Sequence, residues 1–142
     1  MVIYKSFSLL TTQYNDLIRI TDEIEKAVAE SGIKNGIVTV ITKHTTTGIT
    51  VNESLECLES DIDTFLKRLV PEDYPYVHAR MLRSYGSTAG NPTGHLKAHL
   101  TGNHCVFPIV NSEMVKGDAQ DVYFCEFDGP AKRTISISIL GE

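Results

Sequence analysis

The chain has 142 residues, a length that predicts a single domain over residues 1–142 with its own hydrophobic core. Its residues are 42% hydrophobic and 22% charged, so intrinsic disorder is not expected. The formal net charge of -5 argues against a protein that binds nucleic acid through an extended basic surface, and we expect no nucleic-acid partner.

The chain begins with two segments whose apolar residues alternate as in strands. Residues 2–10 alternate well enough to predict a strand. Residues 16–20 follow a segment of Thr, Gln and Asn, and they predict the hairpin partner of that strand. One helix over residues 14–31 is the competing interpretation. We favour the hairpin because Ile18 and Ile20 fit a period of two.

A helix and a buried strand follow. Thr21 is a candidate N-cap, with acidic residues after it at the positive end of the helix dipole. Gly32 is a candidate C′ residue that ends this helix. Residues 36–42 are an apolar run that predicts a buried strand, and residues 49–52 could continue it after a turn at Gly48.

A second helix and a long loop occupy the middle of the chain. Ser54 is the candidate cap of the helix and Pro71 is its stop signal. Residues 71–94 are rich in Pro and Gly and predict a loop, which the histidines at its ends mark as functional. Residues 95–100 predict a short strand or a helical turn. The apolar stripe of the helix, which we assign to the core, consists of Leu55, Leu58, Ile62, Phe65, Leu66 and Leu69.

Three predicted strands complete the chain, at residues 105–110, 121–127 and 134–140. In the last of them Ile alternates with Ser, so we expect one of its faces to be wet or to lie at a subunit interface. Together the elements predict a single α+β domain with a mostly antiparallel sheet and two helices.

The cysteines and the start of the chain bear on the compartment. Cys57, Cys105 and Cys125 have no CxxC spacing, which favours reduced thiols that act as small core residues. The start lacks a basic region followed by a long apolar run, and no apolar stretch approaches 18 residues. We therefore expect a cytoplasmic protein with no membrane partner.

Residues 44–48, His-Thr-Thr-Thr-Gly, are the most informative motif. A strand delivers an imidazole, three hydroxyls and a glycine turn to one place, and the carboxylate of Glu53 follows close behind. Glu53 could be a general base, could orient an imidazole, or could be an acidic residue at a helix N-terminus. We expect later histidines to join His44 in one site built from two distant segments.

His44, His78 and His95 form a candidate metal site, since imidazole suits zinc and similar ions. His95 and His99 are four residues apart. On a helix they would share a face, whereas in a strand they would lie about 13 Å apart, too far for one ion. Polar histidines with ordinary partners, or histidines facing solvent, are the alternative, and this applies also to His99 and His104.

The segment at residues 87–95 is dense in small donors and glycines, which lets backbone N–H groups approach an anion. Lys97 could add positive charge to such a site. The GxxxxGK[ST] spacing of a P-loop is absent, and a plain loop is the alternative interpretation.

Two carboxylates end a predicted strand. Glu126 and Asp128 are at i and i+2 and therefore share a face, where they could hold Mg²⁺ through oxygen ligands. The alternative is a turn in which Asp128 acts only locally. Arg133 follows and could pair with a carboxylate or with a ligand phosphate.

Taken together, these motifs resemble the YjbQ family, small proteins described as secondary thiamine-phosphate synthases, and the match runs nearly end to end. The chain departs from the family pattern at residues 117–120, where the family often has Gly-Thr-Trp-Gln, in a longer loop at residues 79–89, and at His99, where a small hydroxyl residue is common. These departures bear on the substrate more than on the fold. The matching positions are HTTxGI at 44–49, Asn52-Glu53, LVP at 69–71, His78, Gly90-Asn91 with His95 and Lys97, and Gly117, Gln120, Tyr123 and CEFDGP at 125–130.

The resemblance implies an α+β fold and a homotrimer with histidine sites near subunit boundaries. It also implies the joining of a hydroxymethylpyrimidine diphosphate to a thiazole phosphate with release of diphosphate, in which a divalent ion, Mg²⁺ or Zn²⁺, would neutralise the leaving group. The expected catalytic residues are His44, Glu53, Asn91 and His95. The expected phosphate-binding residues are Thr45, Thr46, Lys97, Gln120 and Arg133. The expected metal ligands are His44, His78, His95, Glu126 and Asp128, the last two being alternatively residues that position His and Arg side chains.

Two other functions stay open. One is a hydrolase in which a histidine-bound ion activates water to cleave a phosphorylated or ester metabolite. The other is a non-enzymatic trimer that binds a phosphorylated metabolite without turnover. A metal-free protein that is unaffected by chelators would count against the first, and product formed in excess over protein excludes the second.

Overall fold

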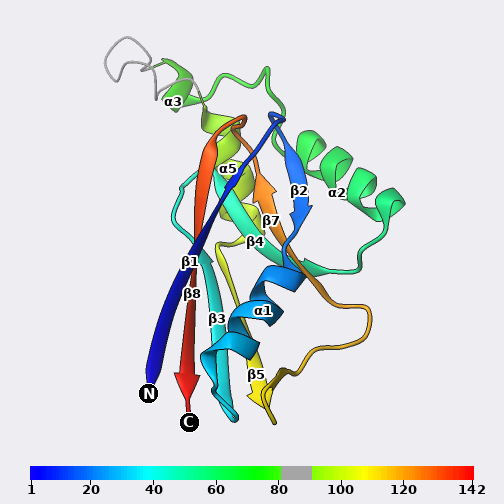
Figure 1. Cartoon of the computed structure of the whole chain (residues 1–142). Helices are drawn as coiled ribbons and strands as arrows, with labels where there is room; N and C mark the ends of the chain where they lie inside the picture. The colour runs from blue at the N-terminus through cyan, green and yellow to red at the C-terminus, as the bar shows by residue number, and fades with distance from the viewer. Residues whose placement is uncertain (81–90) are drawn as a thin grey trace.

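The computed structural model describes residues 1–80 and 91–142, with the backbone alone at Arg80, and it has the predicted α+β class (Figure 1). The predicted small donors at residues 87–90 lie outside the described residues. The strands are β1 (Val2–Leu10), β2 (Asp16–Arg19), β3 (Gly36–Thr42), β4 (Thr47–Asn52), β5 (His104–Val110), β6 (Glu113–Met114), β7 (Asp121–Glu126) and β8 (Lys132–Gly141). The helices are α1 (Thr21–Ser31), α2 (Glu56–Leu69), α3 (Val77–Arg80) and α5 (Pro92–Thr101).

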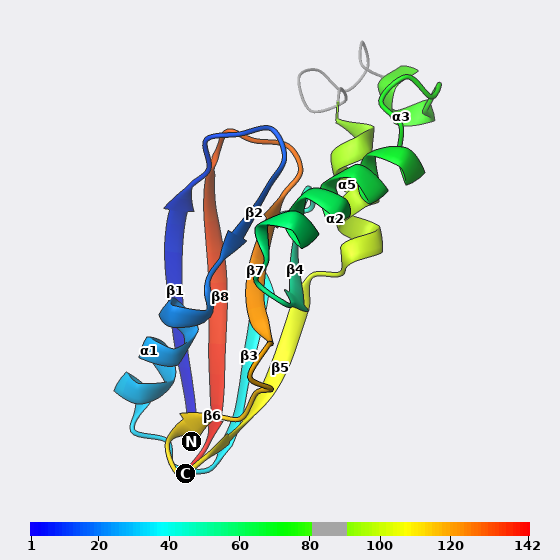
Figure 2. The same ribbon diagram turned by 90° about the vertical axis from the view of Figure 1, so that its right-hand side faces the viewer.

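The described strands form two antiparallel sheets that share one core. The larger sheet has the order β1-β8-β3-β5-β6 and the smaller one the order β2-β7-β4. The main core joins α1 to both sheets, with Ile24, Val38, Phe124 and Ile137 among its buried residues. Full burial of an apolar side chain of this kind contributes about 1.5–3 kcal/mol. Figure 2 shows α2 and α5 on the far side of the smaller sheet from α1.

Helix α1 begins and ends close to the predicted positions. Gly32 has φ 73°, so the predicted left-handed residue at its C-terminus is confirmed. The predicted N-cap is wrong, because the helix starts at Thr21 itself and Ile20 stands before it. The Thr21 hydroxyl instead donates to Asp121 at 2.7 Å and accepts from the Val122 N–H at 2.9 Å, which ties α1 to β7.

The predicted hairpin between the first two strands is also wrong. β1 pairs with β8 in the larger sheet, whereas β2 pairs with β7 in the smaller one. The connection between β1 and β2 runs beside the connection between β7 and β8: the Thr11 N–H donates to the Ala131 carbonyl and the Gly129 N–H donates to the Tyr14 carbonyl. The chain therefore crosses between sheets here, and alternation within each strand could not reveal the crossing.

The same crossing occurs at the motif around His44. β4 does not continue β3 in its sheet, as the sequence had suggested, but pairs with β7 in the smaller sheet. The turn between β3 and β4 therefore connects the two sheets, and the side chains of residues 43–46 lie where the sheets meet.

Two helices differ from the sequence prediction. Helix α2 starts at Glu56 with Leu55 before it, not with Ser54 as cap, and it ends at Leu69 before Pro71 as predicted. Residues 95–100 belong to α5, which settles the open choice between strand and helix. Its start at Pro92 and the short helix α3 shorten the predicted loop, and with them the described helices exceed the two predicted.

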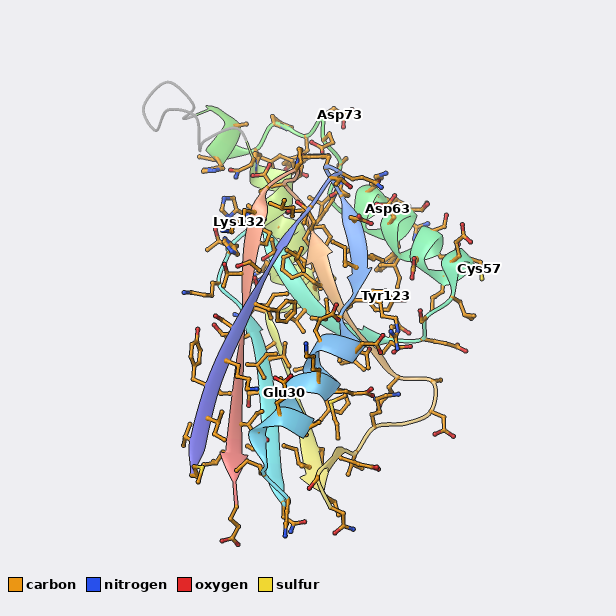
Figure 3. The ribbon with its side chains drawn as sticks, viewed as in Figure 1. Glu30, Cys57, Asp63, Asp73, Tyr123 and Lys132 are labelled. Carbon is orange, nitrogen blue, oxygen red and sulfur yellow. The ribbon has the colours of Figure 1, made fainter. Side chains whose placement is uncertain are left out.

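Burial separates the three free cysteines. Cys125 is buried in β7 and Cys105 is partly buried, but Cys57 is exposed, which corrects its assignment to the core. Figure 3 shows Cys57 near the outer end of α2. Ile62, which packs against the core, comes five residues later. Because an α-helix has 3.6 residues a turn, Cys57 and Ile62 lie on different faces of α2. Within residues 1–80 and 91–142, no helix is long and apolar enough to cross a bilayer.

Candidate functional site

Hydroxyl groups hold the turn that carries His44. The Thr47 hydroxyl donates to the His44 carbonyl at 3.1 Å and lies 2.7 Å from the Thr42 hydroxyl, which also accepts from the His44 N–H. A Cβ at Gly48 would lie 2.8 Å from the Gly102 carbonyl oxygen, so this position requires glycine for the close approach of the segment after α5. The threonines and the glycine of the motif therefore build the turn.

The imidazole of His44 is fixed by the backbone of β8. The Thr134 N–H donates to Nε2 at 2.9 Å, so Nε2 is the unprotonated nitrogen and the neutral ring carries its proton on Nδ1. Partial burial, together with the charge of Arg133, lowers the pKa of His44 and favours this neutral form. His44 can therefore offer Nδ1–H to a ligand without losing its contact with β8.

A buried ion pair supports the turn from behind. Arg133 donates from Nε and Nη2 to the two carboxylate oxygens of Glu126, each at 2.7 Å. The carboxylate also accepts from the Thr11 hydroxyl at 2.6 Å and from the Asp128 N–H at 3.1 Å. Burial alone would raise the pKa of Glu126, but the hydrogen bonds from Arg133 and Thr11 outweigh it and lower this pKa. Arg133 also donates to the Thr46 hydroxyl at 3.3 Å, which links the pair to the motif.

This arrangement bears on the roles expected for the pair. Both oxygens of Glu126 already accept hydrogen bonds and its side chain is fully buried, so in this geometry the carboxylate acts on Arg133 and offers no open position to an ion. The sequence left either a carboxylate or a ligand phosphate as the partner of Arg133. In the structure Arg133 pairs with the carboxylate of Glu126.

A second chain of contacts joins four of the predicted site residues. The Asn91 amide donates to Asp128 at 2.8 Å, and its Oδ1 accepts from His78 Nε2 at 3.1 Å. The His78 ring then meets the His95 ring edge to face, with centroids 5.2 Å apart. Asp128 and Asn91 therefore orient His78 against His95, as outer residues orient imidazoles in many sites.

His44 and His95 meet across a surface hollow of about 380 Å³, which we call the histidine hollow. One wall is the turn that carries His44, and the other is α5, where His95 and His99 stand one helical turn apart. Among the described residues that line it there are three imidazoles and the Lys43 ammonium but no carboxylate. Its lining consists of Thr42, Lys43, His44, Thr45, Thr47, His95, Ala98, His99 and Asn103.

A second hollow adjoins the first and shares His95 with it. It measures about 390 Å³, and it is largely apolar. Its lining consists of Tyr76, Val77, His78, Pro92, His95 and Leu96. The two hollows together place a donor-rich space beside an apolar one.

Other predicted residues lie away from the histidines. β4 pairs with β7 from Thr47 opposite Glu126 to Asn52 opposite Asp121. Glu53, directly after Asn52, and Gln120, directly before Asp121, therefore lie beyond the far end of this pair of strands. Five residues of strand separate the two ends by roughly 17 Å. Within one chain the structure therefore does not bring Glu53 or Gln120 to His44.

Lys97 lies on the opposite side of α5 from His95 and His99. Its side chain is 1% exposed, its Nζ donates to Asn15 at 3.3 Å, and Glu72 is 4.0 Å away. Burial lowers the pKa of Lys97, and Glu72 opposes this effect. A helical period would have predicted this orientation, but the sequence left strand and helix open at this segment.

The sequence also missed residues of the histidine hollow. Lys43 directly precedes the motif and was identifiable by that position, whereas nothing in the sequence pattern marks Asn103. In the part of the chain that the structure describes, no three His, Cys, Asp or Glu side chains converge as a metal site.

The sequence is similar to one protein family along nearly its whole length. A family model described as "UPF0047 protein YjbQ-like" matches residues 5–142. A UPF0047 protein of Methanothermobacter thermautotrophicus is 35% identical over all of this chain and 95% of its own length. The UPF0047 protein YugU of Bacillus subtilis is 34% identical over 96% of this chain and 98% of its own length.

Solved structures show the same fold. A YbjQ-like protein from Sulfolobus solfataricus, described as of unknown function, has a TM-score of 0.90 and 32% identity and covers 100% of this chain and 99% of its own. An uncharacterised protein of the yjbq/upf0047 family from Clostridium acetobutylicum has a TM-score of 0.86 and 35% identity, covering 96% of this chain and 99% of its own. The α+β fold is thus shared along nearly the whole chain.

Proposed function

The chain belongs to the YjbQ-like UPF0047 family, and we propose that it binds the anionic group of a phosphorylated small molecule in the histidine hollow. The observation that carries this proposal is the lining of the hollow. Lysine and histidine donors gather there, and none of the described lining residues is acidic, although the whole chain has a net charge of -5. Hydrogen bonds from such donors to phosphate oxygens are among the stronger ones in proteins.

Each wall of the hollow has its own part in binding. His44 donates Nδ1–H from the turn, where its lowered pKa keeps the ring neutral, and Lys43 and Thr45 extend the same wall. His95 donates from α5, and its contact with His78 limits its rotation. Thr46 and Arg133 are buried, so they hold the turn and do not touch the ligand.

At the level of reaction, we propose the transferase activity that the family resemblance implies. The chain would join a hydroxymethylpyrimidine diphosphate to a thiazole phosphate and release diphosphate. The donors of the histidine hollow would hold the departing diphosphate, where preorganised donors stabilise developing charge, and the apolar hollow beside it would take the ring.

The divalent ion expected for such a reaction does not fit a protein-held site among the described residues. No three candidate ligands converge there, Glu126 is saturated with hydrogen bonds, and Nε2 of His44 accepts the Thr134 N–H. We therefore propose that Mg²⁺ would enter bound to the diphosphate of the substrate.

Self-association into a homotrimer is part of the proposal. The register of the larger sheet sets Val2, Leu140 and Ile37 side by side, and all three are exposed, as is Val106 on the neighbouring strand β5. A contiguous apolar patch on a sheet face commonly marks a protein contact. A cytoplasmic location is consistent with the free cysteines, because thiols stay reduced there.

Product formation from the two phosphorylated precursors with Mg²⁺ tests the proposal. His44→Gln removes Nδ1–H but keeps an oxygen that can accept the Thr134 N–H, and His104→Gln is the matched control outside the hollow. We expect turnover in the native chain and in His104→Gln, and at least a tenfold loss in His44→Gln, since one transition-state donor is commonly worth that much. Equal turnover in both variants would contradict the assigned site, and product that never exceeds protein would leave binding alone.

A further inference from the structure

We infer that His99 is a ligand-contacting residue of the histidine hollow, which rests on the proposed function and extends it. The imidazole lines the hollow one helical turn after His95, on the same side of α5. It is exposed, so it meets solvent or ligand and no protein core. A change of residue at this position should therefore affect ligand binding more than folding.

The other imidazoles of the described chain are already engaged. His44 accepts from Thr134, His78 contacts both Asn91 and the His95 ring, and His104 pairs with Asn103 at 2.8 Å. For His99 the described residues provide no hydrogen-bond or ionic partner. A donor that faces a hollow without acidic side chains, and that has no protein partner, is available to an incoming anion.

His99 lines the same hollow as Lys43 and His95, so it can act as a third hydrogen-bond donor to an anion bound there. Four residues of helix separate it from His95 by about 6 Å along the axis. Between them Ala98 contributes only a methyl group to the floor, which leaves room for a ligand. An anion held between Lys43 and His95 can thus also receive a hydrogen bond from His99, and an anion with several oxygens satisfies all three donors.

The chemical class that fits is a tetrahedral oxyanion such as a phosphate monoester. A carboxylate has two oxygens and a neutral sugar or base has no charge, so neither uses the three cationic or imidazole donors equally well. Inorganic phosphate is the simplest probe of this class.

Calorimetric titration with inorganic phosphate tests the inference in four proteins: the native chain, His99→Met, His99→Lys and His104→Met. Methionine is a good helix former without a hydrogen-bond donor and the position is exposed, so His99→Met should retain the fold. We expect it to weaken phosphate binding about tenfold or more, the fold-change of one hydrogen bond to a charged group. His99→Lys, which keeps a donor, and His104→Met should both stay within about twofold.

The outcomes separate this inference from the proposed function. Native affinity in His99→Met, with saturable binding by the native chain, would overturn the role of His99 and leave the hollow as an anion site. Equal weakening in His99→Met and His104→Met would also overturn it, because the effect would then be general. Absence of saturable binding in the native chain would refute the proposed function itself.

Discussion

Replacing Glu126 by Gln should destabilise the protein more than any single surface substitution. The carboxylate is fully buried and accepts four hydrogen bonds, from Thr11 and Arg133 Nε on Oε1 and from Arg133 Nη2 and the Asp128 N–H on Oε2. The amide of glutamine has only one oxygen. In either orientation its NH₂ group would therefore face two donors.

The magnitude follows from that arrangement. The substitution leaves the Arg133 guanidinium buried without its counter-charge, and breaking a buried pair in this way costs about 3–5 kcal/mol. Small domains are stable by only about 5–15 kcal/mol, so the loss is a large share of the total. The turn that carries His44 should loosen as well, because Arg133 also donates to Thr46.

Urea unfolding followed by circular dichroism measures the loss. Glu30→Gln is the matched control, since it breaks the exposed pair of Glu30 with Lys5 and should leave the urea midpoint nearly unchanged. Arg133→Met in the Glu126→Gln background should recover part of the stability, because it removes the unpaired charge. A loss below about 1 kcal/mol in Glu126→Gln would refute the reasoning.

Other parts of the molecule give four further predictions. Gly94→Ala should lower Tm, because a Cβ there would lie 2.9 Å from the Phe127 carbonyl oxygen. Lys97→Met should leave stability unchanged or raised in urea unfolding, since it replaces a buried ammonium by an apolar side chain of similar length. The pKa of His44 is lowered by folding, so the unfolded chain binds more protons and stability should fall as pH drops through the unfolded pKa of about 6.5. Urea midpoints between pH 7.5 and pH 5 should show a smaller fall in His44→Gln. The homotrimer proposed above predicts that light scattering gives three times the chain mass of 15.7 kDa, and a mass of one chain would contradict it.

Much of the fold was predictable because local pattern and burial agree. The apolar run of β3 and the alternation of β8 fix strands whose inner residues, such as Val38 and Ile137, are fully buried. Gly32 ended α1 as predicted because its φ of 73° favours glycine. Partner strands were not predictable for β2 and β4, since alternation sets which face is buried but not which strand lies alongside.

The site divides in the same way. His44 and His95 belong to motifs that the two strands and α5 bring to one hollow, so their association was predictable in outline. Glu53 is only nine residues from His44 in the sequence, yet β4 carries it to the other end of the sheet. Lys97 lies between two hollow-lining histidines, yet the helical period turns it into the core. Closeness in the sequence therefore did not predict closeness in space for these two residues, because the direction of a strand or the face of a helix decides where the side chain lies.

The most direct test of the central claim is the imidazole ¹H–¹⁵N spectrum of the protein during titration with inorganic phosphate. We expect a neutral His44 with its proton on Nδ1, and saturable shifts at His44 and His95 while His104 stays unchanged. Unsaturable shifts, or shifts equal at His104 and in the hollow, would contradict an anion site in the histidine hollow.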